Sequence, residues 1–387
     1  MREFPKNFLF GSATSAHQIE GGLNNDWSKW EKIPGNIKDG SNSQVACDSW
    51  NCWWEDLKLL KKTGQNAYRF SIEWSRIEPQ KGEFDEKAVL RYREILKGLK
   101  SSGIKSMVTL FHFTLPLWIS GTGGFENRKN TYYFVRFCRK IASELGDLID
   151  LWSVLNEPNV YVLMGYFRND WCPAKKSYFL GFKTFFNLIA AHNRAYRAIK
   201  KIVPKSQIGI ALNMASYVPI GKNWLDRTVS WWAREAGHRF FLRRIKKNLD
   251  FLGINHYMKF QLRWKKPRLV AVLDALSSDF GWHITPTGIY DVITENRHYK
   301  LPIYITENGI ADEKDRLRPD FIRDYLRQVA RAIGDGADVR GYFHWSLLDN
   351  FEWAEGYKMK FGLFTIDRKP RASASVYQRI IETNSID

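Results

Sequence analysis

Eight short runs rich in β-branched and aromatic residues alternate with longer amphipathic segments, and this alternation limits the possible folds more than any other feature. Strands that alternate with helices usually pair in parallel. Eight such units over 387 residues favour a closed (β/α)8 TIM barrel over an open doubly wound sheet. No GxGxxG motif follows the first run, which argues further against a dinucleotide-binding sheet. The expected strands are Leu9–Ala13, Asn66–Ile72, Ser106–His112, Leu151–Leu155, Ile208–Leu212, Phe251–Asn255, Pro302–Thr306 and Gly341–Ser346.

The segments between these runs have the apolar spacing of amphipathic helices. In Pro319–Ile333, apolar side chains recur every three or four residues, and Pro319 indicates the start of the helix. No linker rich in proline or serine divides the sequence, so we expect residues 1–387 to form a single barrel domain. Three further helices are expected at Trp53–Lys62, Glu86–Ser101 and Thr131–Leu145.

The chain carries a large positive charge. Its 59 Lys and Arg residues against 41 Asp and Glu residues give a formal net charge of +18. Such a charge suggests anionic partners, and so do the clusters Arg243–Lys247 and Arg263–Lys266. However, the charge is spread along the chain, and the sequence has no zinc-finger spacing, RNP run or basic heptads. We therefore expect a solvated basic surface and no specific nucleic-acid partner.

Hydropathy and cysteine content indicate the compartment. No stretch approaches the roughly 18 uninterrupted apolar residues of a membrane span, and residues 1–10 lack the features of a secretory signal. A cytoplasmic location without a membrane partner is therefore expected. The four cysteines are too few for a disulfide scaffold and lack the spacing of zinc ligands, so we expect free thiols. They are Cys47, Cys52, Cys138 and Cys172.

Two glutamates follow the carboxyl ends of two expected strands. In a parallel barrel the reactive residues lie at the carboxyl ends of the strands. Polar and aromatic residues recur there, and two of them are carboxylates, Glu157 and Glu307. Two carboxylates that face each other across a pocket suit glycoside hydrolysis, because one can donate a proton while the other is ionised. Taken alone, either glutamate would be better explained as an ordinary strand-end residue with a salt-bridge partner.

The residues around both glutamates make the interpretation specific. Five segments, in the right order along the chain, closely resemble the motifs of glycoside hydrolase family 1, the retaining β-glycosidases. The similarity covers nearly the whole chain, although 387 residues are few for this family. Most of the deficit lies between Glu157 and Asn255, so we expect a wider or shallower leaving-group side. The five segments are Phe10–Gly21, Tyr68–Arg76, Asn156–Pro158, Ile305–Gly309 and Trp345–Trp353.

The resemblance implies a role for each matching residue. Glu157 would be the general acid/base, and Glu307 the nucleophile that forms a covalent glycosyl-enzyme. Asn156 would bind the sugar hydroxyl next to the anomeric carbon, and Trp345 would form a stacking floor beneath the sugar. The other substrate-binding residues would be Gln18, His112, Tyr257, Glu352 and Trp353. The supporting residues would be Arg69, Asn255 and Phe361. The resemblance implies no metal and no organic cofactor.

Elementary electrostatics agrees with these roles. The resemblance implies that Arg69 and Tyr257 contact Glu307, and the charge of Arg69 would keep this carboxylate ionised. Glu157, which faces an anionic partner in a partly dry pocket, should have a raised pKa and carry the proton. Phospho-glycosidases of the family carry serine where this chain has Glu352, whose charge would repel a phosphate. A neutral terminal β-glycoside is therefore favoured.

Three hypotheses follow. The first is a retaining exo-β-glycosidase that acts on small β-glycosides or oligosaccharides, foremost a β-glucosidase with β-galactosidase or β-fucosidase side activity. The second is a transglycosylase, in which an acceptor sugar replaces water in the same intermediate. The third is a catalytically weak barrel that binds sugars or polyanions, suggested by the shortened loops and the basic surface. The presence of both glutamates argues against the third.

Overall fold

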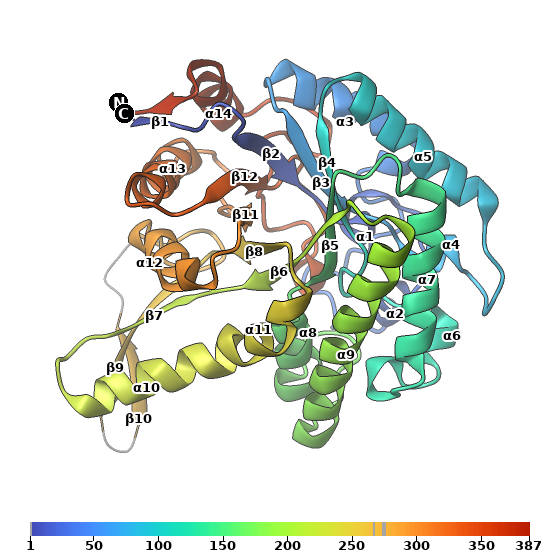
Figure 1. Cartoon of the computed structure of the whole chain (residues 1–387), viewed down its shortest axis with the longest axis horizontal. Helices are drawn as coiled ribbons and strands as arrows, with labels where there is room; N and C mark the ends of the chain where they lie inside the picture. The colour runs from blue at the N-terminus through green and yellow to red at the C-terminus, as the bar shows by residue number, and fades with distance from the viewer. Residues whose placement is uncertain (1, 266–267, 273–275) are drawn as a thin grey trace.

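Eight parallel strands form a closed barrel at the centre of the computed structural model (Figure 1), which describes residues 2–265, 268–272 and 276–387. Each strand corresponds to one of the expected runs, so the (β/α)8 barrel is confirmed. Lys266, the last residue of one basic cluster, lies outside the described residues. In their order around the barrel, the strands are β11 (Ile303–Asn308), β12 (Val339–Trp345), β2 (Leu9–Ala13), β3 (Ala67–Ser71), β4 (Lys105–Thr109), β5 (Leu151–Asn156), β6 (Gln207–Asn213) and β8 (Phe251–Asn255).

The barrel closes because its last strand pairs with its first. Gly341 of β12 lies opposite Leu9 of β2, and Trp345 lies opposite Ala13, in parallel register. Strands β5, β8 and β11 are buried along their whole length. Strands covered on both faces read as continuous apolar runs, and this is why the sequence pattern locates them.

One predicted strand is too long. The run Ser106–His112 was expected to be extended throughout, but β4 ends at Thr109. Beyond it, Phe113 adopts a φ of 74°, which is incompatible with a continuing strand. His112 therefore lies in the loop after the strand, at the barrel rim, and not within the sheet. The other strand boundaries differ from the prediction by at most two residues.

Helices cover the outside of the barrel (Figure 1). In α13, the apolar stripe predicted downstream of Pro319 is buried. Helix α3 starts before the predicted Trp53, because a first turn from Ser49 is joined to it across a kink at Cys52. The longer helices are α3 (Ser49–Lys62), α5 (Glu86–Ser101), α7 (Asn130–Leu145), α9 (Tyr178–Ile202), α10 (Trp224–Arg234), α11 (Phe240–Ile245), α12 (Thr287–Asn296), α13 (Arg318–Gly334) and α14 (Ala372–Thr383).

Short helices occupy the loops. The α-helical ones are α1 (Ala16–Ile19), α2 (Asp26–Trp30), α4 (Trp74–Ile77), α6 (Leu117–Ser120) and α8 (Pro158–Val162). The remaining turns, which are 3-10 or π in type, are η1 (Gly124–Glu126), η2 (Leu163–Arg168), η3 (Glu235–Arg239), η4 (Lys246–Asn248), η5 (Arg297–Tyr299) and η6 (Trp353–Glu355). Several of these loops lie at the carboxyl ends of the strands and shape the rim of the barrel.

Two small sheets lie outside the barrel. Strands β10, β9 and β7 form a three-stranded sheet that the sequence analysis did not predict. Strands β1 and β13 pair in antiparallel fashion, so the two ends of the chain lie side by side (Figure 1). Their bounds are β1 (Arg2–Glu3), β7 (Ser216–Pro219), β9 (Lys259–Lys265), β10 (Arg268–Val272) and β13 (Ser385–Ile386).

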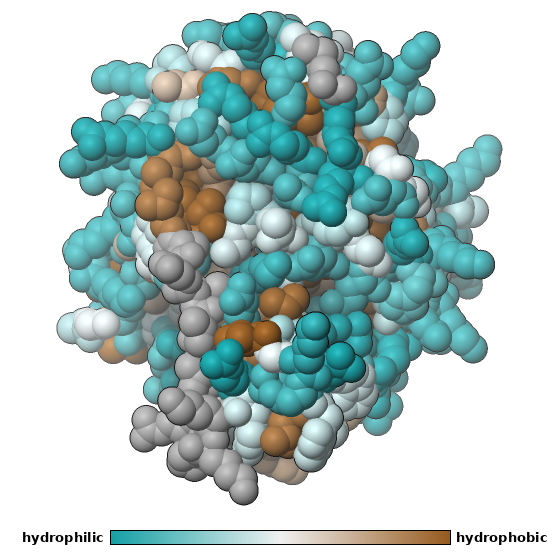
Figure 2. All heavy atoms as spheres, turned by 90° about the vertical axis from the view of Figure 1, so that its left-hand side faces the viewer, coloured by the Kyte–Doolittle hydropathy of each residue, from teal (hydrophilic) through white to brown (hydrophobic). Residues whose placement is uncertain are grey.

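The polarity of the surface and the state of the cysteines are as expected for a basic, folded chain. Figure 2 shows hydrophilic side chains over most of one face, interrupted by separate hydrophobic groups. All four cysteines are free, as expected. Within the described ranges, no helix is long and apolar enough to cross a bilayer.

Candidate active site

One large cavity lies at the carboxyl ends of the barrel strands. Its volume is about 790 Å³, within the range of small-molecule sites. Glu157 and Glu307 both line it, so the two glutamates singled out in the sequence share one cavity. The other predicted residues that line it are His112, Asn156, Tyr257, Trp345, Glu352, Trp353 and Phe361. Gln18, Arg69 and Asn255 lie behind the wall, and each hydrogen-bonds to a residue that lines it.

Glu157 directly follows β5 and is held in an unusual backbone conformation. Its φ is 41°, in the left-handed region that non-glycine residues rarely adopt, and Pro158 begins α8 immediately afterwards. Its amide donates to the carbonyl oxygen of Ala211 at 2.8 Å. The side-chain amides of Asn213 and Asn255 both donate to Oε1, at 3.0 and 2.8 Å. Because Oε1 accepts both bonds, the proton of a neutral Glu157 belongs on Oε2.

Glu307 lies within β11 and is paired with a cation. Nη1 of Arg69, on β3, lies 2.5 Å from Oε1 of Glu307. The hydroxyl of Tyr257 donates to Oε2 at 2.8 Å. The Arg69 side chain is fully buried and the Glu307 side chain nearly so, a setting in which charge-assisted hydrogen bonds are strong. Glu157, in contrast, forms no ion pair with any residue of the described part of the chain.

A continuous chain of hydrogen bonds joins the two glutamates. Oδ1 of Asn156 accepts from Nη2 of Arg69 at 2.7 Å and from Nδ2 of Asn255 at 3.1 Å. Thr306 donates to Oδ1 of Asn255 at 2.7 Å and so fixes the orientation of that amide. Nδ2 of Asn156 lies 3.1 Å from Nε2 of His112. The carboxyl groups are therefore positioned by side chains that are themselves held in place.

The surroundings separate the proton affinities of the two carboxyl groups. Burial raises the pKa of Glu157 to about 8, and the charge of Glu307 acts in the same direction, while Asn213 and Asn255 oppose it. Burial also raises the pKa of Glu307, but Arg69 and Tyr257 counteract that rise. Glu307 therefore loses its proton first, and Glu157 keeps the remaining one. The cavity can hold a carboxylate and a carboxylic acid at the same pH.

A third acidic side chain, Glu352, lies on another wall of the cavity. Nε2 of Gln18 donates to Glu352 at 3.1 Å and to Asn350 at 3.0 Å. Burial raises the pKa of Glu352 to about 8, and the charge of Glu307 adds to this. A carboxyl and an amide placed together can accept from and donate to neighbouring hydroxyl groups.

Aromatic rings form part of the same cavity. The ring of His112 stacks on Trp345, with centroids 6.1 Å apart, and on Trp353, with centroids 6.0 Å apart. Phe361 contacts the ring of Tyr257 edge-on at 6.5 Å. Flat apolar faces beside polar groups suit a sugar, which has both a C–H face and hydroxyl groups.

Asn213 and Trp171 are among the residues of this cavity that sequence reasoning missed. Asn213, which donates to Glu157, is the last residue of β6, one position beyond the predicted end of that strand. The rule that polar residues at strand ends are functional would have found it, had the strand been extended by one residue. Trp171 lines the cavity and packs against Trp353 at 5.7 Å. It lies in a loop after η2, where no sequence pattern indicated a contact.

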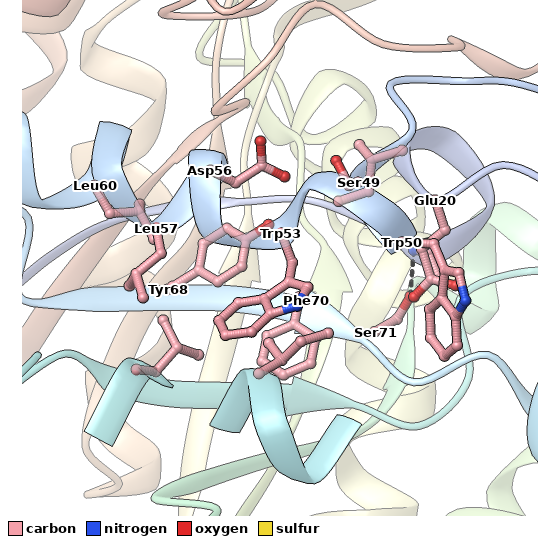
Figure 3. A pocket seen from close by; sticks show the side chains of 14 residues that line it. Glu20, Ser49, Trp50, Trp53, Asp56, Leu57, Leu60, Tyr68, Phe70 and Ser71 are labelled. Atoms are coloured by element: carbon pink, nitrogen blue, oxygen red, sulfur yellow. Dashed lines mark hydrogen bonds between the residues drawn. The ribbon is translucent and has the colours of Figure 1, made fainter. Parts of the chain in front are cut away.

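A second cavity, outside the barrel wall, is much smaller (Figure 3). It lies between α3, β3 and α5 and has a volume of about 40 Å³, enough for a few ordered waters. Trp53, Leu57 and Phe70 line it, and the nearby Asp56 carboxylate accepts from Nε of Arg368 at 2.8 Å. It is too small for a sugar. In the part of the chain that the structure describes, no three His, Cys, Asp or Glu side chains are grouped as metal ligands.

The fold and the site define a class: a (β/α)8-barrel protein with an acidic pair arranged for acid–base and nucleophilic chemistry at the carboxyl ends of its strands. Comparison with known families identifies it further. The model of glycosyl hydrolase family 1 matches residues 1–243 and 240–386, and the chain belongs to this family.

Individual relatives match along their whole length. Beta-glucosidase A of Acetivibrio thermocellus is 34% identical over 441 aligned positions, which cover 98% of this chain and 98% of that protein. The beta-galactosidase of Saccharolobus solfataricus is 33% identical over 100% of this chain and 96% of its own length. The solved beta-glucosidase from Thermotoga maritima in complex with glucoimidazole has a TM-score of 0.96 at 30% identity and covers 100% of both chains. The alignment with beta-glucosidase A has 441 positions, more than the 387 residues of this chain, so it contains gaps in this chain. Such gaps are expected for a short family member.

Proposed function

We propose that this chain is a retaining exo-β-glycosidase that hydrolyses terminal β-D-glucosyl residues of small glycosides, with β-galactosides and β-fucosides as side substrates. One observation carries the proposal: Glu157 and Glu307 line the same cavity, and only Glu307 has a cationic partner. Relatives named beta-glucosidase and beta-galactosidase support it. The Thermotoga maritima structure, which is in complex with glucoimidazole, supports a sugar-sized ligand in this fold.

In the first step, the carboxylate of Glu307 attacks the anomeric carbon. Glu157 donates its proton to the glycosidic oxygen as the bond between that oxygen and the anomeric carbon breaks. The leaving group departs as an alcohol, and the sugar is held as an ester of Glu307. Glu157 is now ionised, and its negative charge no longer faces another one, because the ester is neutral.

In the second step, Glu157 takes a proton from a water molecule whose oxygen attacks the anomeric carbon. The ester bond breaks, the carboxylate of Glu307 is restored, and Glu157 carries a proton again. Two inversions at the same carbon give net retention of configuration. Glu352 and Gln18 would hold hydroxyl groups of the bound sugar, and Glu352 would repel a phosphorylated sugar when its carboxyl group is ionised.

The direct test is a panel of nitrophenyl β- and α-glycosides combined with NMR observation of the first sugar released. We expect turnover of the β-glucoside, slower turnover of the β-galactoside and β-fucoside, and initial release of the β-anomer. Initial release of the α-anomer would contradict the double displacement. Absence of turnover on every β-glycoside, in a chain that melts cooperatively, would contradict the proposed activity.

We also propose that residues 1–387 form one catalytic domain located in the cytoplasm. Closure of the barrel between β2 and β12 and pairing of β1 with β13 support the single domain. The four free cysteines are compatible with a reducing compartment. A single calorimetric transition and recovery of the chain from inside the cell are expected. Two separable protease-resistant fragments would contradict the single domain, and recovery outside the cell would contradict the location.

A further inference from the structure

Helices α9 and α10 expose an unusual number of large aromatic side chains. On α9, Phe179, Phe182 and Phe186 follow one another at helical spacing, and their exposed fractions are 76%, 57% and 50%. On α10, Trp224 and Trp232 are 72% and 62% exposed. Single exposed apolar residues are ordinary, but a group of exposed aromatic side chains indicates a contact surface. We call the following set the aromatic face: Tyr178, Phe179, Phe182, Phe186, Trp224, Trp231 and Trp232.

The two halves of the aromatic face are connected through α11. Helix α10 continues through η3 into α11, and α11 lies beside α9 (Figure 1). Phe240, the first residue of α11, contacts Phe186 with ring centroids 6.0 Å apart. Cζ of Arg244 lies 3.3 Å from the centroid of the Phe240 ring. Aromatic and cationic side chains are therefore interleaved along this side of the molecule.

The exposed charge around the aromatic face is positive. Helix α9 contains Lys and Arg but no Asp or Glu. Between residues 222 and 247, the acidic residues are Asp226 and Glu235, and both are buried. Glu235 is also paired with Arg243, and on the α9 side Lys175 is paired with Glu126. The basic residues that the structure leaves exposed along these segments include Lys176, Lys183, Lys222, Arg227, Arg244, Lys246 and Lys247.

The aromatic face adjoins the mouth of the active site. Phe167 of η2 contacts Tyr178 and Phe182, with ring centroids 5.1 and 5.5 Å apart. The same short helix contributes Leu163 and Met164 to the wall of the large cavity. A surface bound to the aromatic face would therefore lie next to the opening through which substrate enters.

We propose that the aromatic face binds peripherally to anionic lipid membranes. Aromatic side chains favour the interface between headgroups and acyl chains, and Lys and Arg around them attract anionic lipids. A helix with aromatic residues on its outer side and basic residues around them lies on such a surface without crossing it. A second copy of this chain is disfavoured, because the same face would bring two sets of positive charges together. The absence of a spanning segment, on which the sequence-based expectation of no membrane partner rested, does not bear on a surface of this kind.

Co-sedimentation with vesicles tests this inference independently of the proposed activity. The probes are vesicles of phosphatidylcholine alone and of phosphatidylcholine with phosphatidylglycerol. We expect the wild-type chain to bind the anionic vesicles, and binding to weaken at high salt. The double variants Trp224→Ser/Trp232→Ser and Phe179→Ser/Phe182→Ser should each bind at least about tenfold more weakly, because exposed aromatic area is removed. Hydrolysis of a soluble nitrophenyl glycoside should be unchanged in both.

A matched control comes from exposed apolar residues outside the aromatic face. Leu90 on α5 and Tyr132 on α7 are 58% and 60% exposed, and the double variant Leu90→Ser/Tyr132→Ser should bind as the wild type does. No binding of the wild type to anionic vesicles at low salt would overturn the proposal. So would equal binding by the wild type and both aromatic variants, which would indicate a general polyanion contact. Dimerisation that the aromatic substitutions abolish, without vesicle binding, would assign the face to a second copy instead.

Discussion

The guanidinium group of Arg69 lies 2.5 Å from the carboxylate of Glu307, and both side chains are buried. Glu157, in the same cavity, is held by the neutral amides of Asn213 and Asn255. A cation stabilises a carboxylate more than an amide does. The difference in partners therefore assigns the negative charge to Glu307 and the proton to Glu157.

The first prediction concerns the pH dependence of kcat/KM, which reports groups of the free enzyme. Activity requires Glu157 in its protonated form, and its pKa is raised to about 8. Activity should therefore fall as pH rises through about 8 and should also fall at low pH, where Glu307 becomes protonated. Initial rates on a nitrophenyl β-glucoside across the pH range would check this. Loss of activity on the alkaline side below pH 6 would contradict it.

The second prediction separates Glu157 from Glu352, whose pKa is also raised to about 8. Glu157→Gln should lower kcat/KM on a poor leaving group by about 10²- to 10⁴-fold, the usual contribution of a general acid. A dinitrophenyl leaving group needs no proton, so formation of the glycosyl-enzyme from it should be affected much less. In this variant, the alkaline limb measured with that substrate should disappear. A limb that persists near pH 8 would assign the titration to Glu352.

The third prediction concerns Arg69. Arg69→Met removes the cation that lowers the pKa of Glu307, so the acidic limb of the profile should move to higher pH. The loss in kcat/KM should reach at least about a hundredfold, the scale of removing one preorganised electrostatic partner. Arg69→Lys keeps the charge and should move the acidic limb less. Thermal melts control for folding, and an acidic limb that stays in place in a folded Arg69→Met variant would contradict the role.

The fourth prediction concerns Asn213, which sequence reasoning missed. Its amide stabilises the ionised form of Glu157, so Asn213→Ala should raise the pKa of Glu157 and move the alkaline limb to higher pH. Asn36→Ala is the matched control, since Asn36 lines the same cavity and its side-chain amide donates to the carbonyl oxygen of Trp30 and not to a glutamate. A limb that moves to lower pH, or moves equally in both variants, would show that Asn213 does not act through Glu157.

The sequence was sufficient to predict the barrel because its strands are buried on both faces. Strands β2 and β8 have the predicted bounds, and helix α5 begins and ends where its apolar spacing indicated. The three-stranded side sheet was missed although Lys259–Lys265 (β9) alternates between polar and apolar residues, the pattern of a half-buried strand. The sequence analysis interpreted Arg263–Lys266, which overlaps this strand, only as a cluster of positive charge.

The site was predictable where a family motif or a strand end marks the residue. Glu157 and Glu307 follow or end buried strands, and their neighbours in sequence carry the family resemblance. Trp171 reaches the cavity only because its loop folds back over the rim, a long-range contact that no local pattern encodes. The aromatic face was also missed, because it forms only after α9 packs against the barrel and α10 against the side sheet.

The central claim is that Glu307 forms a covalent bond to the sugar, and trapping that bond tests it most directly. A β-glucoside with a dinitrophenyl leaving group and fluorine on the carbon next to the anomeric centre should form the ester quickly and hydrolyse slowly. Mass spectrometry of a protease digest should then find one sugar on the peptide that contains Glu307. Labelling of the peptide with Glu157 or Glu352 instead, or no labelling of a chain that turns over the unfluorinated glucoside, would contradict the account.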